Sequence, residues 1–375
     1  MPKIRDIRCR AFDVPLREAF GIAGGTQFTA QNVLVELELD NDVVGLGEAA
    51  PFPAVNGETQ AAVLAALPAA TAVLRGTEIL SYRRVSDAIR EVASGTPSAR
   101  AALEIALFDA WARSASVSLL SFFGGAEARL RTDITIPTGS PEAAQDAARR
   151  AAQAGFSTLK VKVGGPTASH DIAHDVARLQ GICDAAPHAE LVLDANASLD
   201  ESSTCALFDG LAQLARRVVL LEQPTAAEDV DTLRRLRSRL TVPIAADESA
   251  RSAADVARLA LHRAVDVINI KTMKTGIVEA LDMICTARAH GLGLMIGGMV
   301  ETEISMSTSA CLAAGVGGFQ FVDLDTPCFM AARPLEGGFR QRGSDLDLSQ
   351  IELGHGVRHL LGPGADWSEG TERHA

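Results

Sequence analysis

The sequence predicts an α/β protein in which a small α+β domain precedes a closed barrel of eight parallel strands. Three observations lead to this prediction. The chain has 375 residues, which is enough for two domains. From about residue 132, short apolar segments rich in β-branched residues alternate with amphipathic helical segments. Polar residues recur at the ends of these apolar segments 24 to 32 residues apart, a spacing typical of strand-and-helix units.

Residues 1–126 show the mixed pattern of an α+β domain. The segment 33–49, VLVELELDNDVVGLGEA, alternates apolar and polar residues around an Asp-Asn-Asp turn, which is typical of a β-hairpin. Three helical patterns follow it, near 58–75, 83–94 and 97–115.

Eight apolar segments are expected to form the barrel strands, with a helix between each consecutive pair. They read DITIPTG, TLKVKVG, LVLDAN, VVLLEQP, IAADES, VINIKT, LGLMIGG and FQFVDLD. The first helix is expected over 141–154, with Ser140 as its N-cap and Gly155 after its end. Eight such units favour a closed barrel. The rival, an open doubly wound sheet, normally carries a Gly-rich phosphate loop, and KVGGP fits that loop poorly.

Composition and charge exclude several classes of partner. The formal net charge is −12, whereas nucleic-acid and anionic-membrane partners require a basic face. The six cysteines form no CxxC pair, so we expect free thiols in a reducing cytoplasm. The N-terminus lacks the apolar core of a signal peptide. The uncharged segment 304–322 is about as long as a membrane span, but its glycines and hydroxyl residues favour a helix, a loop and a strand. The eight histidines are expected at the surface.

Polar side chains at the C-terminal ends of barrel strands face one common mouth. In chain order, this mouth is expected to receive Lys160, Lys162, Asp194, Asn196, Glu222, Asp247, Glu248, Lys271, Asp323 and Asp325. Asp194, Glu222 and Asp247 come from three consecutive strands, so their charges would repel one another without a cation between them. Oxygen ligands alone favour Mg²⁺, or Mn²⁺, over zinc. The sequence therefore predicts a divalent metal site.

Two lysines flank the three acidic strands, Lys162 before them and Lys271 after them. Lysines on opposite sides of a metal suggest two bases that act on one carbon atom. Lys160 and the metal are positive neighbours of Lys162, and like charges favour the neutral amine that a base requires. The metal would stabilise the enolate oxygen that forms when a proton leaves the carbon next to a carbonyl.

Each of these residues taken alone has a simpler structural interpretation. A single aspartate at a strand end is usually a helix N-cap. Lys274 is interpreted as a solvated helix start, Glu248 as a neighbour of the ligand Asp247, and Asn196 as a hydrogen-bond partner of the ligands. The joint pattern favours an active site instead, because K-x-K, D-x-N, E-Q-P, D-E-S and I-K lie on five successive strands.

With these motifs the chain resembles the enolase superfamily, in its muconate lactonizing enzyme subgroup, over essentially its whole length. LKVKVG, LDAN, LEQP, ADES and NIKTMKTG carry the resemblance. It implies a capping domain of residues 1–126, a modified (β/α)₇β barrel of residues 127–325, and a segment 326–375 that returns to the capping domain. No histidine stands at a strand end, which argues against the mandelate racemase subgroup.

The same resemblance implies roles for individual residues. The metal ligands would be Asp194, Glu222 and Asp247, and the two opposed bases would be Lys162 and Lys271.

The last strand motif, VDLDTP, is similar to that of the dipeptide epimerases, in which two carboxylates hold the free α-ammonium group of the substrate. Asp323 and Asp325 would take that role. Muconate cycloisomerases and succinylbenzoate synthases act on anions and have no use for two acids there. The residues expected to contact the substrate are Thr135, Lys160, Gly298, Met299, Asp323 and Asp325.

One departure from the family pattern bears on the substrate. Relatives specific for Ala-Glu carry an arginine in the N-terminal loop that covers the site. Here the loop reads FGIAGGTQF, with the pair Gly24-Gly25 in it and Gly25 at the place of the arginine. The expected substrate is therefore a dipeptide whose second residue is apolar or cationic.

Two alternatives stay open at this point. An N-acylamino-acid racemase, a dehydratase, or a cycloisomerase of the muconate or succinylbenzoate type could use the same scaffold, and Asp323 and Asp325 would then have no role. A non-enzymatic binder of peptides would have no use for two opposed lysines. The sequence does not determine the preferred side chains, the biological pathway, or which lysine serves which stereoisomer. A homo-oligomer is possible, and the sequence does not determine the oligomeric state.

Overall fold

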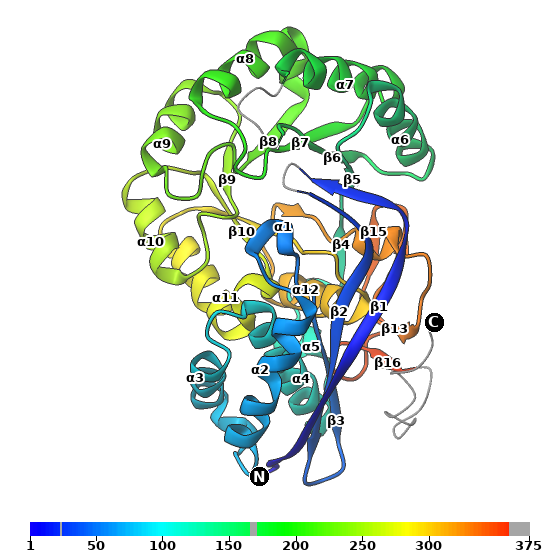
Figure 1. Ribbon diagram of the computed structural model, residues 1–375, viewed down its shortest axis with the longest axis vertical. Helices are drawn as coiled ribbons and strands as arrows, with labels where there is room; N and C mark the ends of the chain where they lie inside the picture. Colours follow the sequence, from blue (N-terminus) through cyan, green and yellow to red (C-terminus); the bar gives the residue numbers. More distant parts are fainter. Residues whose placement is uncertain (23–24, 166–170, 360–375) are drawn as a thin grey trace.

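The computed structural model describes residues 1–22, 25–165 and 171–359 of the chain (Figure 1). An N-terminal domain combines an antiparallel sheet with helices. A second domain forms a curved parallel sheet with helices along its outer side. This is the expected fold class, a modified (β/α)₇β barrel with an α+β capping domain, and the prediction is confirmed.

The capping domain is built on three antiparallel strands in the order β1-β2-β3. Their bounds are Ile4–Ile22, Gly25–Leu39 and Val44–Ala49. The hairpin expected over 33–49 consists of the end of β2 and all of β3. Sequence analysis missed β1. Its pairing with β2 shifts register between Pro15 and Phe20, so no single alternating pattern runs along it.

The three helices expected in this domain are present as α2 (Gln60–Leu74), α3 (Tyr82–Val92) and α4 (Pro97–Ser114). The structure adds three short helices that were not predicted, α1 (Pro53–Asn56), η1 (Ile79–Ser81) and α5 (Leu119–Phe122). Helix α4 packs directly on β3. A Cβ at Gly45 would lie 2.1 Å from the carbonyl oxygen of Ala106, and one at Gly47 would lie 2.0 Å from that of Ala102. Glycine at these two positions allows the close approach.

Eight parallel strands follow in chain order within one sheet. They are β5 (Ile134–Ile136), β6 (Thr158–Lys162), β7 (Glu190–Asp194), β8 (Val218–Glu222), β9 (Ile244–Ala246), β10 (Val267–Ile270), β11 (Gly293–Ile296) and β12 (Phe321–Val322). The first and last strands meet. The N–H of Asp133 donates to the carbonyl of Val322 at 3.0 Å, and the N–H of Leu324 donates to Oγ1 of Thr132 at 2.9 Å.

One helix follows each strand except the last. These are α6 (Pro141–Gln153), α7 (Ile172–Ala185), α8 (Glu201–Leu211) with η2 (Ala212–Arg217), α9 (Val230–Arg239), α10 (Ala253–Leu261), α11 (Thr272–Ala289) and α12 (Glu303–Val316). Helix α6 begins as predicted, since Oγ of Ser140 accepts the N–H of Ala143 at 3.2 Å. No described helix is long and apolar enough to cross a membrane.

The register of the barrel sheet brings the polar strand ends to one level. Lys162 pairs with Asp194, and Asp194 pairs with Glu222. Glu222 pairs with Ala245, and Asp247 follows two residues later on the same face. Short parallel strands in register therefore gather these side chains at the C-terminal end of the barrel.

Residues 326–359 lie against the capping domain. They contain η3 (Thr326–Phe329), β13 (Leu335–Gly337), β14 (Arg340–Arg342), β15 (Asp345–Asp347) and β16 (Val357–His359), and β15 also pairs with β4 (Arg129–Arg131). The N–H of Ala331 donates to the carbonyl of Pro15 at 2.8 Å, and the N–H of Leu119 donates to that of Gly354 at 2.6 Å. The division at 126 and 325 stays a prediction. Residues 360–375, predicted to belong to this last segment, lie outside the described part.

One histidine corrects the expectation that all eight lie at the surface. His355 is fully buried where the C-terminal segment meets the capping domain. Its N–H donates to Oδ1 of Asp109 at 2.9 Å, and its Nε2 lies 3.1 Å from the carbonyl oxygen of Leu46. The imidazole ring lies between segments that are far apart in the sequence. The local sequence around His355 therefore does not show that it is buried.

Two buried glutamates of the capping domain accept backbone N–H groups from barrel helices, one at a helix start and one just after a kink. Glu48 accepts the N–H of Thr302 at 2.9 Å, at the start of α12. Glu104 accepts the N–H of Val278 at 2.9 Å, where Gly276 interrupts α11 with φ 73°. Carboxylates satisfy helix N–H groups and their positive partial charge. The capping domain thereby fixes the two barrel helices that follow β10 and β11.

Candidate active site

Lys160 is the centre of a buried network of opposite charges. Its side chain is 1% exposed. Its Nζ lies 3.0 Å from Oδ2 of Asp194, 2.7 Å from Oε2 of Glu222 and 2.7 Å from Oδ2 of Asp323. These carboxylates neutralise the charge of the Lys160 ammonium group, whose burial without a partner would cost much free energy. Lys160 is predicted to contact the substrate, and its position between Asp323 and the metal-ligand candidates is compatible with that role.

The two candidate bases lie on opposite flanks of the acidic strands. Nζ of Lys162, on β6, donates to Oδ2 of Asp194 at 2.7 Å. Nζ of Lys271, which follows β10, donates to Oδ2 of Asp247 at 2.6 Å. Burial lowers the pKa of Lys271, but the charges of Asp247 and Glu222 outweigh burial and raise it above its ordinary value.

The three predicted metal ligands have a donor set that fits a hard divalent cation. Asp194, Glu222 and Asp247 are 0%, 0% and 2% exposed and end three neighbouring strands. Oε2 of Glu222 makes no hydrogen bond within the described structure, although Nζ of Lys160 is close to it. Three buried carboxylates that share lysine ammonium groups can exchange those groups for one cation, and their oxygen-only chemistry suits Mg²⁺. Besides the lysines, Nδ2 of Asn269 donates to Oε1 of Glu222 at 2.7 Å.

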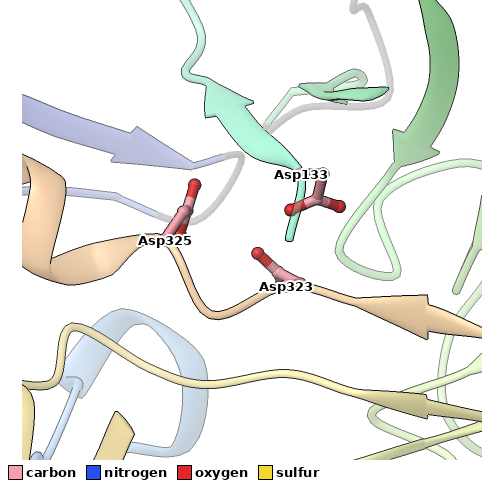
Figure 2. Close-up of side chains that lie close together, drawn as sticks. All are labelled: Asp133, Asp323 and Asp325. Carbon is pink, nitrogen blue, oxygen red and sulfur yellow. The ribbon is translucent and has the colours of Figure 1, made fainter. Parts of the chain in front are cut away.

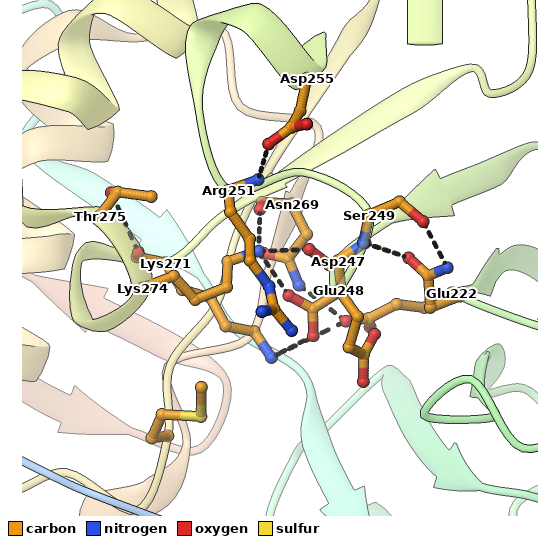
Figure 3. Close-up of polar contacts among 12 residues, drawn as sticks. Glu222, Asp247, Glu248, Ser249, Arg251, Asp255, Asn269, Lys271, Lys274 and Thr275 are labelled. Atoms are coloured by element: carbon orange, nitrogen blue, oxygen red, sulfur yellow. Dashed lines mark hydrogen bonds and ion pairs between the residues drawn. The ribbon is translucent and has the colours of Figure 1, made fainter. Parts of the chain in front are cut away.

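Lys274 corrects the sequence interpretation. It was expected to be a solvated helix start, yet its side chain is 8% exposed. Figure 3 shows Lys274 among the side chains around Asp247. Its Nζ donates to Oδ1 of Asp247 at 2.6 Å and to the carbonyl of Asn269 at 3.0 Å. Lys274 lies about one helical turn after Lys271, so its side chain can reach the same carboxylate.

Asn196 and Glu248 lie beside two of the predicted metal ligands, Asp194 and Asp247. The backbone N–H of Asn196, rather than its side chain, donates to Oδ1 of Asp194 at 3.0 Å. Its Nδ2 donates to Oε1 of Glu248 at 3.4 Å. Burial and then the charge of Asp247 raise the pKa of Glu248 to about 8. Glu248 thus lies next to the predicted ligand Asp247, and its role as a neighbour of a metal ligand stays a prediction.

Asp323 and Asp325 follow β12 and lie at the same mouth. Asp323 contacts Lys160, as described above, and Oδ2 of Asp325 accepts the backbone N–H of Thr135 at 2.6 Å. Oδ1 of Asp325 has no hydrogen-bond partner within the described residues. Burial and then the charge of Asp323 raise the pKa of Asp325 to about 7. Two acids at this spacing could together receive a cationic group.

Sequence analysis missed a third acid at this place, Asp133. It is 3% exposed, and oxygens of Asp133, Asp323 and Asp325 all lie within 4.8 Å of one another. Figure 2 shows the three carboxyl groups around one small space. A signal was present in the sequence, because Asp133 and Thr135 are two residues apart on one strand segment and therefore face the same side.

One cavity brings most of the predicted residues together. Its polar lining contains Thr135, Lys160, Lys162, Asn196, Asp247, Lys271, Asp323, Asp325 and Thr326. Asp194 and Glu222 are 0% exposed and contact the cavity-lining Lys160 from behind its surface. Gly298 and Met299 line it as predicted. Its apolar lining was not predicted, apart from Met299, and adds Phe20, Phe52, Val55 and Val300. Phe20 comes from β1, and Phe52 and Val55 come from or adjoin α1, so the capping domain closes the mouth of the barrel.

The loop that departs from the Ala-Glu pattern lies against α1. A Cβ added at Gly25 would lie 2.9 Å from Cβ of Ala54. A larger residue at this position would push the hairpin and α1 apart. Gly24, the other glycine of the predicted pair, lies outside the described residues.

Comparison with known families agrees with this arrangement. Residues 4–124 match the model of the mandelate racemase / muconate lactonizing enzyme N-terminal domain, and residues 142–359 match that of the enolase C-terminal domain-like family. The aromatic dipeptide epimerase of Herpetosiphon aurantiacus is 44% identical to this chain, over 94% of the chain and 98% of the relative. The chain belongs to the dipeptide epimerase family of the enolase superfamily. As a member of this family it is an enzyme of the isomerase class.

Other members of the family extend the likeness. The hydrophobic dipeptide epimerase of Citrifermentans bemidjiense is 34% identical, over 95% of this chain and 97% of the relative. The dipeptide epimerase of Enterococcus faecalis, in a structure complexed with Mg and the dipeptide L-Leu-L-Tyr, is 32% identical. It superposes with a TM-score of 0.90 and covers 95% of this chain and 100% of the other.

Proposed function

We propose that this protein is a Mg²⁺-dependent epimerase that inverts one Cα of a dipeptide whose second residue is apolar. The observation that carries the proposal is the position of Asp323 and Asp325. They lie in the same cavity as Lys162 and Lys271, on the far side of Lys160 from the metal-ligand candidates. Such a cavity can hold an ammonium group at one end and a carboxylate at the other, which are the two ends of a dipeptide.

The proposed mechanism uses Lys162 and Lys271 as two opposed bases. One lysine takes the proton from Cα and the other returns a proton to the opposite face, with the roles exchanged for the other stereoisomer. Asp194, Glu222 and Asp247 would hold Mg²⁺, which when bound offsets the negative charge that develops on the substrate carboxylate. Binding of a cation by these carboxylates would also withdraw them from the lysines, which favours the neutral amine.

The preference for an apolar second residue is supported by the lining of the cavity. Phe20, Phe52, Val55, Met299 and Val300 are the apolar residues of that lining. Among the described residues that line it, the cations are Lys160, Lys162 and Lys271, which already contact carboxylates. An acidic side chain would find no free cation, whereas an apolar side chain would gain about 25 cal/mol per Å² of buried surface. Relatives named for aromatic and hydrophobic dipeptides point the same way.

Blocking the substrate amine tests the role of the two acids. N-acetylation of a good dipeptide is expected to lower kcat/KM at least about tenfold, since a hydrogen bond to a charged group contributes ~1.5–3 kcal/mol. Asp323→Asn and Asp325→Asn should each lower kcat/KM for the free dipeptide and leave that for the acetylated one nearly unchanged. Asp345→Asn, an exposed carboxyl of β15, is the control. Equal or faster turnover of the acetylated compound would instead identify an N-acylamino-acid racemase.

The apolar lining predicts an order of substrates. Ala-Phe and Ala-Leu are expected to have at least tenfold higher kcat/KM than Ala-Glu, measured by deuterium incorporation from D₂O with Mg²⁺. Dipeptides with lysine or arginine as the second residue are measured in the same assay, because the sequence also allowed a cationic second residue. Phe20→Ala should lower kcat/KM for Ala-Phe about tenfold or more. Phe28→Ala, an exposed residue of β2, serves as the matched control. A preference for Ala-Glu would overturn this assignment.

The cytoplasm is proposed as the place of action. The six cysteines are free in the described structure, and three of them, Cys183, Cys205 and Cys311, are buried. Thiols without disulfide partners are typical of a reducing compartment. Fractionation of cells that produce the native protein would test this.

A further inference from the structure

Asp133 lies next to the pair of acids Asp323 and Asp325 and has no assigned role. Its backbone joins the two edges of the barrel sheet, because its N–H donates to the carbonyl of Val322. Its side chain points to the inside, toward Asp323 and Asp325 (Figure 2). An acid that served only to close the barrel would not need a buried carboxyl group facing two others.

The acids of this cluster are only partly satisfied. Oδ2 of Asp323 accepts from Lys160, and Oδ2 of Asp325 accepts from the N–H of Thr135. Oδ1 of Asp133 and Oδ1 of Asp325 have no hydrogen-bond partner within the described residues, and both side chains are more than nine-tenths buried. Buried polar atoms are rarely left without a partner. Two such atoms within one cluster of acids indicate that the cluster receives a donor.

The nearby positive charge does not meet this need. Lys160 is the cation that faces the cluster, and its single ammonium group also contacts Asp194 and Glu222. Burial, then the charges of Asp323 and Asp325, raise the pKa of Asp133 well above its ordinary value. The cluster therefore carries more acid than its own lysine can balance, and a second cation entering from the cavity would be stabilised.

We propose that Asp133 is the third carboxylate of the subsite that receives the α-ammonium group of the dipeptide, together with Asp323 and Asp325. The inference rests on the proposed function. A primary ammonium has three N–H donors, and three carboxyl groups on three sides supply one acceptor to each. Such a site rejects a substrate that lacks the amine, because its buried acceptors would then stay unpaired.

The test compares Ala-Phe with N-propionyl-phenylalanine, which has the same shape but lacks the amine. Wild type is expected to prefer Ala-Phe at least tenfold in kcat/KM. In Asp133→Asn this preference should fall by about tenfold, through a higher KM for Ala-Phe, since one charged acceptor is lost. Asp266→Asn is the matched control, because Asp266 also precedes a barrel strand but bonds Arg237 on the outside of the cavity. It should keep the wild-type preference.

The outcomes separate the two proposals. A wild type without preference for Ala-Phe contradicts the proposed function itself. If wild type prefers Ala-Phe and Asp133→Asn keeps that preference in full, only the role of Asp133 is overturned. Asparagine would then act like a protonated aspartate that merely fills the site. A weaker Mg²⁺ affinity of the variant, measured by calorimetry, with an unchanged preference would also overturn it. If Asp133→Asn does not fold, Asp133→Ser is measured against the same two substrates and criteria.

Discussion

Replacing Lys162 or Lys271 by alanine is expected to abolish epimerisation, with a loss of about 10²–10⁴-fold or more, the usual contribution of a general base. Each variant should still exchange the Cα proton of one stereoisomer in D₂O, because the other lysine remains on its own face of the substrate. The two variants should exchange opposite stereoisomers. Mass spectrometry combined with chiral separation measures both effects in one experiment.

A chemical rescue distinguishes a missing base from a disturbed fold. Lys271→Cys treated with 2-bromoethylamine regains an amine at nearly the same position, and activity should return. Wild type treated in the same way is the control, because Cys285 is exposed and will also react. Lys162→Arg keeps the positive charge but cannot act as a base, so it should stay inactive. Epimerisation near the wild-type rate in either alanine variant would remove the two-base mechanism.

Removal of the metal is expected to be as severe as loss of a base. After exhaustive chelation with EDTA, activity should fall at least about 100-fold, since the charge on the substrate carboxylate would have no counterion. Mg²⁺ or Mn²⁺ should restore it. Glu222→Gln should reproduce the loss even with excess Mg²⁺, because Glu222 lies between the other two ligand candidates in the sheet. Full activity after chelation would contradict the metal step.

Thermal unfolding supplies a readout that does not depend on activity. Mg²⁺ that binds only the folded protein raises Tm in a concentration-dependent way. Wild type should show this shift, and Glu222→Gln should lose most of it. Asp231→Asn is the control, since its carboxyl lies exposed on α9 with 72% of its side chain accessible. A shift retained in Glu222→Gln would place the cation elsewhere, with the cluster of Asp133, Asp323 and Asp325 as the first candidate.

Local sequence was enough to place the barrel strands and their polar ends. Apolar segments of strand length with helices between them predict parallel pairing, and parallel pairing sends every strand end to one rim. The prediction that Lys162, Asp194, Glu222, Asp247 and Lys271 lie together needed no more than this rule. The hairpin of β2 and β3 was equally readable from its alternation and turn. In each case the information lies within about thirty residues of the chain.

Tertiary structure decided the contacts between segments far apart in sequence. Lys274 was expected to be solvated, but its ammonium group is buried against Asp247, a residue 27 positions earlier in the chain. Phe20 belongs to a strand that the sequence did not reveal, and only docking of the capping domain brings it to the mouth of the barrel.

Asp133 shows the same division most clearly. The sequence shows that Asp133 is an acid two positions before Thr135. It does not show that the N–H of Thr135 donates to Asp325, which lies 190 positions away and brings the acids together. The sequence by itself determined the fold class, the family and the chemistry at the strand ends, because strand periodicity and parallel pairing are local. Closure of the barrel and docking of the capping domain decided which charges are buried together and which apolar residues face the substrate, because burial depends on the whole packed chain.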